Sequence, residues 1–287
     1  MATVTADARS LRGPGHPATP SREERLETAH GLLLEGLAQL TTSDAWTRML
    51  HVAARFHNYS AGNVLLILAQ RPDATRVAGL RLWNSLGRRV NRGEHGIKII
   101  VPITKKETDE TTGNDEHRIV AFSVGTVFAE DQTSGDDLDP VAPQLLTGAA
   151  PEGLIEKVCA LIENEGFTVS FGDCGTANGL TNWVTRTVTI RDDLEPLAKA
   201  KTALHEAGHV FAHAPEILTE PVCRGIKEVE AESIAFIVAE TLGIDTSTYS
   251  FPYVAHWASG VGDLAAVQAT AERVITHARK ILNGLDT

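Results

Sequence analysis

Two histidines and a glutamate stand at a spacing that lets them act together. His205 and His209 are four positions apart, and Glu206 directly follows the first histidine. On a helix, positions i and i+4 lie on one side about one turn apart, so both imidazoles can reach one metal ion. Zinc lowers the pKa of a bound water to about 7, and a neighbouring carboxylate can then take its proton. The segment HEAGH therefore predicts Zn²⁺ ligands at His205 and His209 and a catalytic base at Glu206.

A third ligand is expected from a second helix at about residues 227–242. Catalytic zinc needs three protein ligands and one open position. Glu228 and Glu232 are four residues apart and share a helix face, whereas Glu230 points elsewhere. We predict that Glu228 binds the metal and that Glu232 orients a histidine by accepting its free N–H. The reverse assignment of these two glutamates remains an alternative.

His213 resembles a further ligand but is excluded by distance. It lies eight residues beyond His205, which is about 12 Å along a continuous helix. A donor to the developing oxyanion is also needed. The aromatic segment YSFPYVAHW offers three candidates, from which we select Tyr253, the alternative being that they pack against or cap the last helix. The candidates are Tyr249, Tyr253 and His256.

The first third of the chain is basic, although the whole chain is acidic with a net charge of −11. Residues 1–104 hold 13 Lys and Arg against 8 Asp and Glu, a net charge of +5, whereas the remainder has 13 against 29. Cations that follow a phosphate backbone, with aromatic rings on which bases stack, are typical of single-strand binding. The pattern is therefore compatible with nucleic-acid binding, the alternative being that the arginines are solvated and that Trp46 and Trp83 belong to the core. The candidate contacts are Tyr59, Arg71, Arg76, Arg81, Trp83, Arg88, Arg89, Arg92 and Lys98.

The elements that must position these residues form an α+β pattern in both halves. Ser21 and Glu24 make a capping box for a first helix that continues to residue 40, and Ser43 and Ser60 are expected caps of the next two. Further helices are expected at 80–86, 151–166, 195–213, 227–242 and 263–283. Strands are expected at 97–103, 117–130, 167–172 and 183–191.

Two stretches of the chain resemble known families. HEAGH followed by EVEAESIAF is similar to gluzincin-type peptidases of the ImmA/IrrE group and to the C-terminal domains of ArdC-type antirestriction proteins. The segment from RFHNYSAGN to IKIIVPI resembles the N-terminal domain of ArdC-type proteins. The first resemblance implies a zincin-like domain with two His and one Glu on zinc, and the second implies single-stranded DNA binding. The second resemblance adds Asn63 to the candidate DNA contacts. The alternative is that Tyr59, Ser60 and Asn63 only cap a helix and hold it in place.

Composition indicates a disordered tail at 1–20 and a linker at 131–149, and the resemblance assigns an ArdC-like domain to 21–130 and a metallopeptidase domain to 150–287. The predicted function is a single-stranded-DNA-binding zinc metallopeptidase of the antirestriction type. Two alternatives stay open. One is a non-proteolytic DNA-binding antirestriction protein that uses the zinc fold as a scaffold, and the other is a zinc hydrolase with a non-peptide substrate.

Composition limits the class of protein. No run approaches the roughly 18 consecutive apolar residues of a membrane span, and the first residues lack the apolar core of a signal peptide. The three cysteines form neither a CxxC pair nor an even set, so a disulfide framework is not indicated. A cytoplasmic protein with no membrane partner is expected.

Overall fold

The computed structural model describes residues 20–40, 42–108, 115–138, 150–214, 224–247 and 264–286. Within them, helices and short sheets combine in an α+β fold, which confirms the predicted class. The predicted tail and most of the predicted linker lie outside the described residues, as do Tyr249, Tyr253 and His256. Among the described helices, none combines the length and hydropathy needed to cross a membrane.

The three N-terminal helices begin where short polar side chains cap them. Ser21 and Glu24 form the predicted capping box, with 3.1 Å from Glu24 N to Ser21 Oγ and 2.6 Å from Ser21 N to Glu24 Oε2. Ser60 caps the third helix as expected, but the second is capped by Thr42 and not by Ser43, which is its first helical residue. The helices are α1 (Arg22–Ala38), α2 (Ser43–Arg55) and α3 (Ala61–Gln70).

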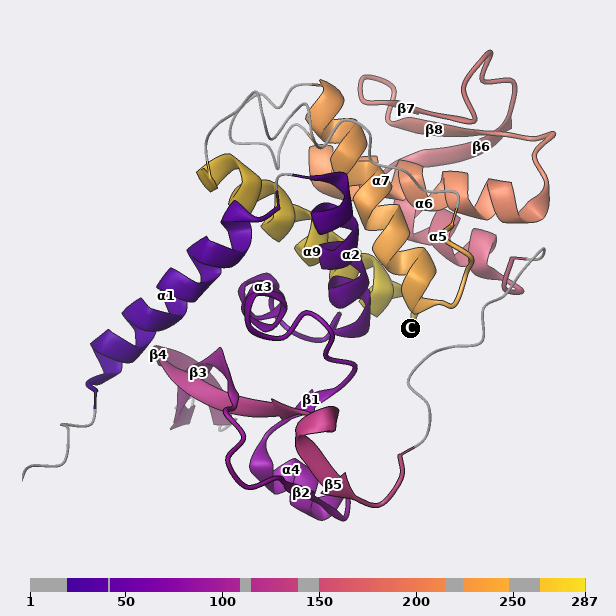
Figure 1. The fold of residues 1–287 in the computed structure, drawn as a ribbon. Helices are drawn as coiled ribbons and strands as arrows, with labels where there is room; N and C mark the ends of the chain where they lie inside the picture. Colours follow the sequence, from indigo (N-terminus) through magenta and orange to yellow (C-terminus); the bar gives the residue numbers. More distant parts are fainter. Residues whose placement is uncertain are drawn as a thin grey trace, which may run out of the picture.

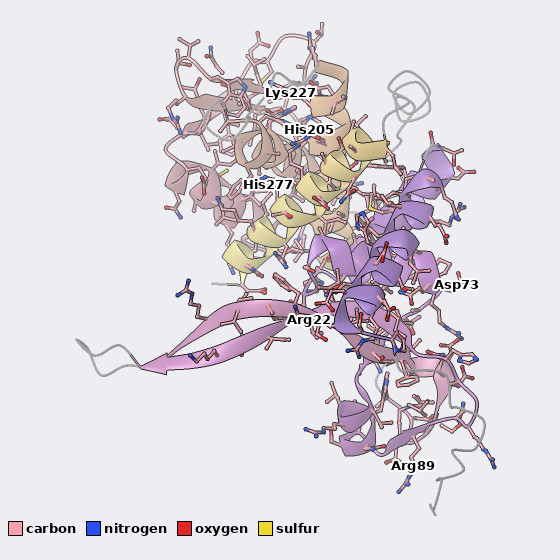
Figure 2. The ribbon with its side chains drawn as sticks, turned by 90° about the vertical axis from the view of Figure 1, so that its left-hand side faces the viewer. Arg22, Asp73, Arg89, His205, Lys227 and His277 are labelled. Atoms are coloured by element: carbon pink, nitrogen blue, oxygen red, sulfur yellow. The ribbon has the colours of Figure 1, made fainter. Side chains whose placement is uncertain are left out.

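A long antiparallel hairpin follows, and it projects from the body of the molecule (Figure 2). Its strands are β3 (Ile97–Thr108) and β4 (Asp115–Ala129), and β1 (Val77–Ala78) pairs with β4 to give the order β1-β4-β3. Both long strands were expected, but β3 is longer than predicted because it stays paired with β4 beyond a register shift at Ile103 and Thr104.

Two amide side chains from α3 close the open edge of β3. Asn63 donates to Ile100 O and accepts from Ile100 N, each at 2.8 Å. In the same way, Gln70 Nε2 donates to Lys98 O at 2.9 Å, and Gln70 Oε1 accepts from Lys98 N at 2.8 Å. Each amide thus takes the place of a neighbouring strand and satisfies backbone groups that an edge leaves unpaired. This contact fixes the hairpin to the helical layer.

A small lobe lies below this sheet in Figure 1. It contains α4 (Leu80–Ser85), β2 (Arg88–Val90), the 3₁₀ turn η1 (Glu130–Gln132) and β5 (Thr133–Gly135). Strand β5 pairs with β2, so the first residues of the predicted linker are ordered structure. Asp and Gly content suggested a linker there, but pairing with a strand distant in sequence overrides that local signal.

The described residues of the second half combine four helices with a small mixed sheet (Figure 1). The sheet has the order β6-β8-β7, in which β7 was not expected from the sequence. Its four residues, GLTN, are too few and too polar to give a strand signal. The elements are α5 (Leu154–Asn164), β6 (Thr168–Gly172), β7 (Gly179–Asn182), β8 (Thr187–Arg191), α6 (Pro196–His213), α7 (Arg224–Thr241) and α9 (Leu264–Leu285).

Helix α2 joins the two halves, because it packs directly against α7 (Figure 1). The indole N–H of Trp46 donates to Ser233 Oγ at 2.9 Å inside the core, and His51 Nδ1 lies 2.9 Å from Glu240 Oε1. The buried apolar residues of both halves form one continuous cluster. The predicted division at residues 130–150 therefore does not separate two independent cores.

The edge closure by α3 generates a prediction for stability. Replacing Asn63 with Ala leaves both backbone groups of Ile100 without partners, and an unsatisfied buried polar group costs about 1–3 kcal/mol. We expect Asn63→Ala to lower the free energy of unfolding clearly, as measured by denaturant titration. Gln70→Ala is the matched control, because Lys98 is exposed and water can replace the lost amide. Equal effects of the two substitutions would contradict this account.

Candidate metal centre and nucleic-acid surface

Helix α6 carries the HEAGH segment, and a close crossing with α7 brings its histidines to the acidic residues of that helix. Gly208 lies at the crossing, where an added Cβ would stand 2.9 Å from Ala231 O and 3.0 Å from Ala231 Cα. Any larger residue would therefore push the two helices apart. Small residues on both helices set a separation at which side chains of α7 reach those of α6.

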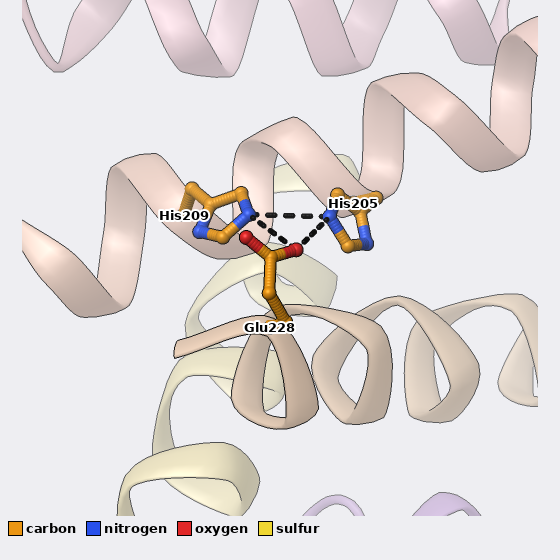
Figure 3. A group of neighbouring side chains, drawn as sticks. All are labelled: His205, His209 and Glu228. Carbon is orange, nitrogen blue, oxygen red and sulfur yellow. Dashed lines mark hydrogen bonds and ion pairs between the residues drawn. The ribbon is translucent and has the colours of Figure 1, made fainter. Parts of the chain in front are cut away.

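Three side chains converge at this crossing (Figure 3). His205 Nε2 and His209 Nε2 are 3.2 Å apart, and Glu228 Oε2 lies 3.4 Å from the first and 3.6 Å from the second. Ligands each about 2.1 Å from one tetrahedral ion are separated by about 3.4 Å. The triangle therefore has the size that a divalent cation requires, and its donors, two imidazoles and a carboxylate, suit zinc.

The other predicted glutamate stands behind the first histidine. Glu232 Oε2 lies 2.9 Å from His205 Nδ1, on the side of the ring that faces away from Glu228. A carboxylate in that position accepts the Nδ1 hydrogen and leaves the Nε2 lone pair directed at the other two donors. The structure thus places Glu228 among the converging donors and Glu232 behind them.

In the metal-free chain, the histidines and glutamates of this cluster stabilise each other's charged forms. Burial disfavours a charged His205, but hydrogen bonds to Glu228 and Glu232 outweigh burial and raise the pKa of His205 to about 10. Hydrogen bonds from His205 and His209 lower the pKa of Glu228 far below its ordinary value. Without a metal, a proton on His205 therefore holds the donors together.

Glu206, the predicted base, lies beside the three donors with a side chain supported by β7. Its Oε2 accepts from Thr181 Oγ1 at 2.6 Å, and the residue is 4% exposed. Gly179 on the same strand leaves room for the carboxylate, because a Cβ there would stand 2.5 Å from Glu206 Oε1. Strand β7, which was not expected from the sequence, thus supplies both the hydrogen bond and the space.

His213 and Glu230, which sequence reasoning set aside, lie directly behind His209. His209 Nδ1 is 3.0 Å from His213 Nδ1, and His213 Nε2 is 2.8 Å from Glu230 Oε2. Neither is among the three converging donors, in agreement with the exclusion of His213 as a ligand. Burial lowers the pKa of His213 below its ordinary value. The i+4 spacing from His209 to His213 was the signal that could have revealed this contact.

A cavity of about 820 Å³ opens over the converging donors. Residues of β7 and its approach line one side of it, and side chains of α6 and α7 line the other. Its basic lining residues include Lys201, Arg224 and Lys227. A space of this volume on a cluster of donors is large enough for a segment of peptide or a small ligand.

Several residues predicted to contact DNA have structural partners instead. Trp83 is 1% exposed and donates to Phe128 O, so its ring is not available for base stacking. Asn63 is buried and bonded to β3, and Tyr59 is half-buried with its hydroxyl on Val77 O. The alternative that Tyr59 and Asn63 seat a helix accounts for their contacts, and the alternative that Trp83 is a core residue accounts for its burial. Aromatic content alone does not distinguish a buried ring from an exposed one.

The predicted cations divide into two groups. Arg71 and Arg76 face Asp131 and Glu130, and Arg88 donates to the backbone and to Thr133 of the small lobe. The exposed group is Arg81, Arg89, Arg92 and Lys98. Figure 2 places Arg89 at the opposite end of the molecule from His205. A nucleic-acid surface built on these cations would therefore be distant from the cavity.

The hairpin offers an exposed aromatic ring that sequence reasoning missed. Phe122 is 51% exposed and stands opposite Pro102, on the strand face that also carries the Lys98 and Thr126 pair. Ile119 follows on the same face beyond the register shift. The alternation in HRIVAFSVGTVFAE indicated a strand, but which of its faces is open could not be decided without the packing of α3.

The His205 cluster generates a prediction for pH. A folded pKa of about 10, above the ordinary 6.5, means that the ion pairs stabilise the metal-free fold fully below pH 6.5. This contribution declines as pH rises toward 10. We expect Glu228→Gln to lower the pKa of His205 in an NMR titration. The difference in unfolding free energy between wild type and Glu228→Gln should shrink from pH 6.5 to 10, and a constant difference would contradict the assignment.

Comparison with known proteins finds a matching family model for one segment and a distant relative for most of the chain. Residues 34–128 match the family model of the N-terminal domain of anti-restriction factor ArdC. An uncharacterized protein of Bacillus anthracis, pXO2-81, is 24% identical over 306 aligned residues, which cover 92% of this chain. The chain spans about half, 52%, of the length of that relative.

Two crystal structures of the antirestriction protein ArdC from plasmid R388 share the fold. The metal-free form is 20% identical with a TM-score of 0.53, and covers 79% of this chain and 85% of ArdC. The Mn(II)-bound form is 19% identical with a TM-score of 0.51, over 79% and 84% of the two chains. The chain therefore has an ArdC-like fold, and its residues 34–128 are similar in sequence to the ArdC N-terminal domain.

Proposed function

We propose that this chain is an ArdC-type antirestriction protein that binds single-stranded DNA and carries a zinc-dependent peptidase centre. The convergence of His205, His209 and Glu228 beneath an open cavity, with Glu206 beside them, carries the enzymatic part of the proposal. A purely structural metal site has no use for an adjacent carboxylate base. The Mn(II)-bound state of the R388 protein supports a divalent cation at a centre in this fold.

The residues have separable tasks in this proposal. His205, His209 and Glu228 would hold the cation, which supplies Lewis-acid activation of water and of a scissile carbonyl. Glu206 takes the proton from the attacking water and can return it to the leaving amine. Thr181 holds one Glu206 oxygen, so the other remains available for the proton. Tyr253 stays the predicted donor to the oxyanion.

The substrate proposed for the cavity is an extended peptide segment. Strand β7 lies on the edge of its sheet, pairs with β8 on one side, and lines the cavity with its residues. Its outer backbone groups can pair with an added strand, which is a general mode of peptide recognition. Such pairing would hold the peptide backbone beside Glu206.

Single-stranded DNA is proposed for the other end of the molecule. The segment that matches the ArdC N-terminal domain, residues 34–128, carries four exposed cations: Arg81 on α4, Arg89 on β2, Arg92 in the loop after β2, and Lys98 on β3. Phe122 provides an open ring face on the hairpin. Cations for phosphate and an aromatic surface for bases are the two components of binding that tolerates any sequence.

Metal analysis and proteolysis test the centre together. His205→Ala and Glu228→Gln should lose bound zinc in elemental analysis, because each removes one of three donors. Glu206→Gln should retain the metal, yet cleave an unfolded protein such as casein about 10²–10⁴-fold more slowly, since a general base contributes that factor. If wild type cleaves nothing, with or without single-stranded DNA, and Glu206→Gln still protects DNA from restriction, the scaffold alternative is correct.

Binding of a labelled oligonucleotide at several salt concentrations tests the surface. Affinity should fall as salt rises, and Arg89→Glu with Arg92→Glu should weaken binding and reduce the salt dependence, by about one unit of slope for each lost phosphate contact. Phe122→Ala should weaken binding without changing the slope. Lys280→Glu on α9 changes the net charge by as much as Arg89→Glu alone, so it is the control for that single variant and should have no effect on binding. Absence of binding at low salt would refute the DNA proposal.

A further inference from the structure

A continuous line of polar side chains leads from His209 away from the cavity, and its two middle members, His213 and Glu230, are fully buried. His209 Nδ1 lies 3.0 Å from His213 Nδ1, and His213 Nε2 lies 2.8 Å from Glu230 Oε2. Arg273 Nε on α9 donates to Glu230 Oε1 at 2.9 Å. We propose that His213, Glu230 and Arg273 form a positioning relay that fixes the ring orientation and tautomer of His209 for metal binding. The inference rests on the metal centre proposed above.

The direction of the hydrogen bonds follows from the two ends of the relay. Arg273 is only a donor, and beside its guanidinium the Glu230 carboxylate is only an acceptor. His213 Nε2 therefore donates to Glu230, and a neutral ring then has a lone pair at Nδ1. That lone pair requires His209 to carry its hydrogen on Nδ1. The Nε2 lone pair of His209 is thereby directed at His205 and Glu228, where the other two donors stand.

Burial makes this arrangement rigid. The side chains of His213 and Glu230 are 0% exposed, so water cannot replace either partner. A carboxylate in such a place is strongly destabilising unless it is paired, and Arg273 is the paired cation. The relay therefore extends from α6 through α7 to α9, and the last helix takes part in positioning a residue of the centre.

The two histidines of the centre receive equivalent support by different routes. Glu232 accepts directly from Nδ1 of His205. Glu230 is two residues earlier on α7 and points to another side of the helix, where it cannot reach His209 itself. His213, one turn beyond His209 on α6, spans that gap. Alternate glutamates of one helix thus serve both imidazoles, one directly and one through a third histidine.

Glu230→Gln is the sharpest test, because the new side chain has the same size but reverses the donor and acceptor roles in the hydrogen bond to His213. Arg273 still requires an acceptor, so the amide oxygen faces Arg273 and the amide NH₂ faces His213 Nε2. His213 must then carry its hydrogen on Nδ1, opposite the hydrogen of His209. We expect zinc affinity, measured against a chromophoric chelator, to fall by about 10–100-fold, the usual effect of losing such a partner. Glu240→Gln, on the same helix and bonded to His51, should leave zinc affinity unchanged.

Two further variants separate positioning from packing. In His213→Asn the amide oxygen stands near the former Nδ1 and can accept from His209, so affinity should remain within a few-fold of wild type. His213→Leu keeps bulk but offers no acceptor, and should lose affinity as Glu230→Gln does. Circular dichroism and thermal melting of each metal-free variant show whether the fold is retained. Wild-type affinity in folded Glu230→Gln would overturn the relay.

NMR of the histidine rings tests the proposal without any substitution. In zinc-loaded wild type we expect the ring hydrogen of His213 on Nε2 and that of His209 on Nδ1. The opposite placement on either ring would overturn the relay even if the variants failed to fold. Failure of the wild type to bind zinc would instead refute the metal centre, and the His213 tautomer in the metal-free protein would then decide the relay separately.

Discussion

The close crossing of α6 and α7 is the constraint on which the rest of the site depends. Gly208 has no side chain at the point where the backbone of Ala231 passes, and this allows the helices to approach until glutamates of one reach histidines of the other. Glu228 then lies near Nε2 of both His205 and His209, Glu230 near Nε2 of His213, and Glu232 near Nδ1 of His205. Because packed helices do not tolerate even small added volume, the centre is sensitive to residues that never touch a metal or substrate.

The crossing alone does not place Glu206, the proposed base. Glu206 follows its histidine on α6, and its carboxylate is fixed by β7, whose Thr181 donates to it and whose Gly179 makes room for it. The same strand lines the cavity. A short edge strand thus connects Glu206 with the cavity, so in the proposed enzyme peptide recognition and proton transfer would depend on the same four residues.

Sequence reasoning succeeded where a local rule decides the outcome and failed where packing does. The i+4 spacing of His205 and His209, the capping box at Ser21 and the helix periods required no tertiary information. Strand β7, the reach of His213 to Glu230 and the burial of Trp83 depend on elements far apart in the chain. The sequence does not distinguish a buried tryptophan from an exposed one. The burial of Trp83 becomes clear only from the structure, in which its indole N–H donates to the carbonyl of Phe128.

Helix α2 has a consequence for how the molecule can be divided. Its Trp46 side chain is completely buried and bonded to Ser233, one residue from the glutamate behind His205. A fragment beginning at residue 150 would therefore expose an apolar strip of α7 to water and lose a partner for a buried hydroxyl. The second half of the chain therefore depends on α2 for a complete core, and we expect the two halves to unfold together as one cooperative unit.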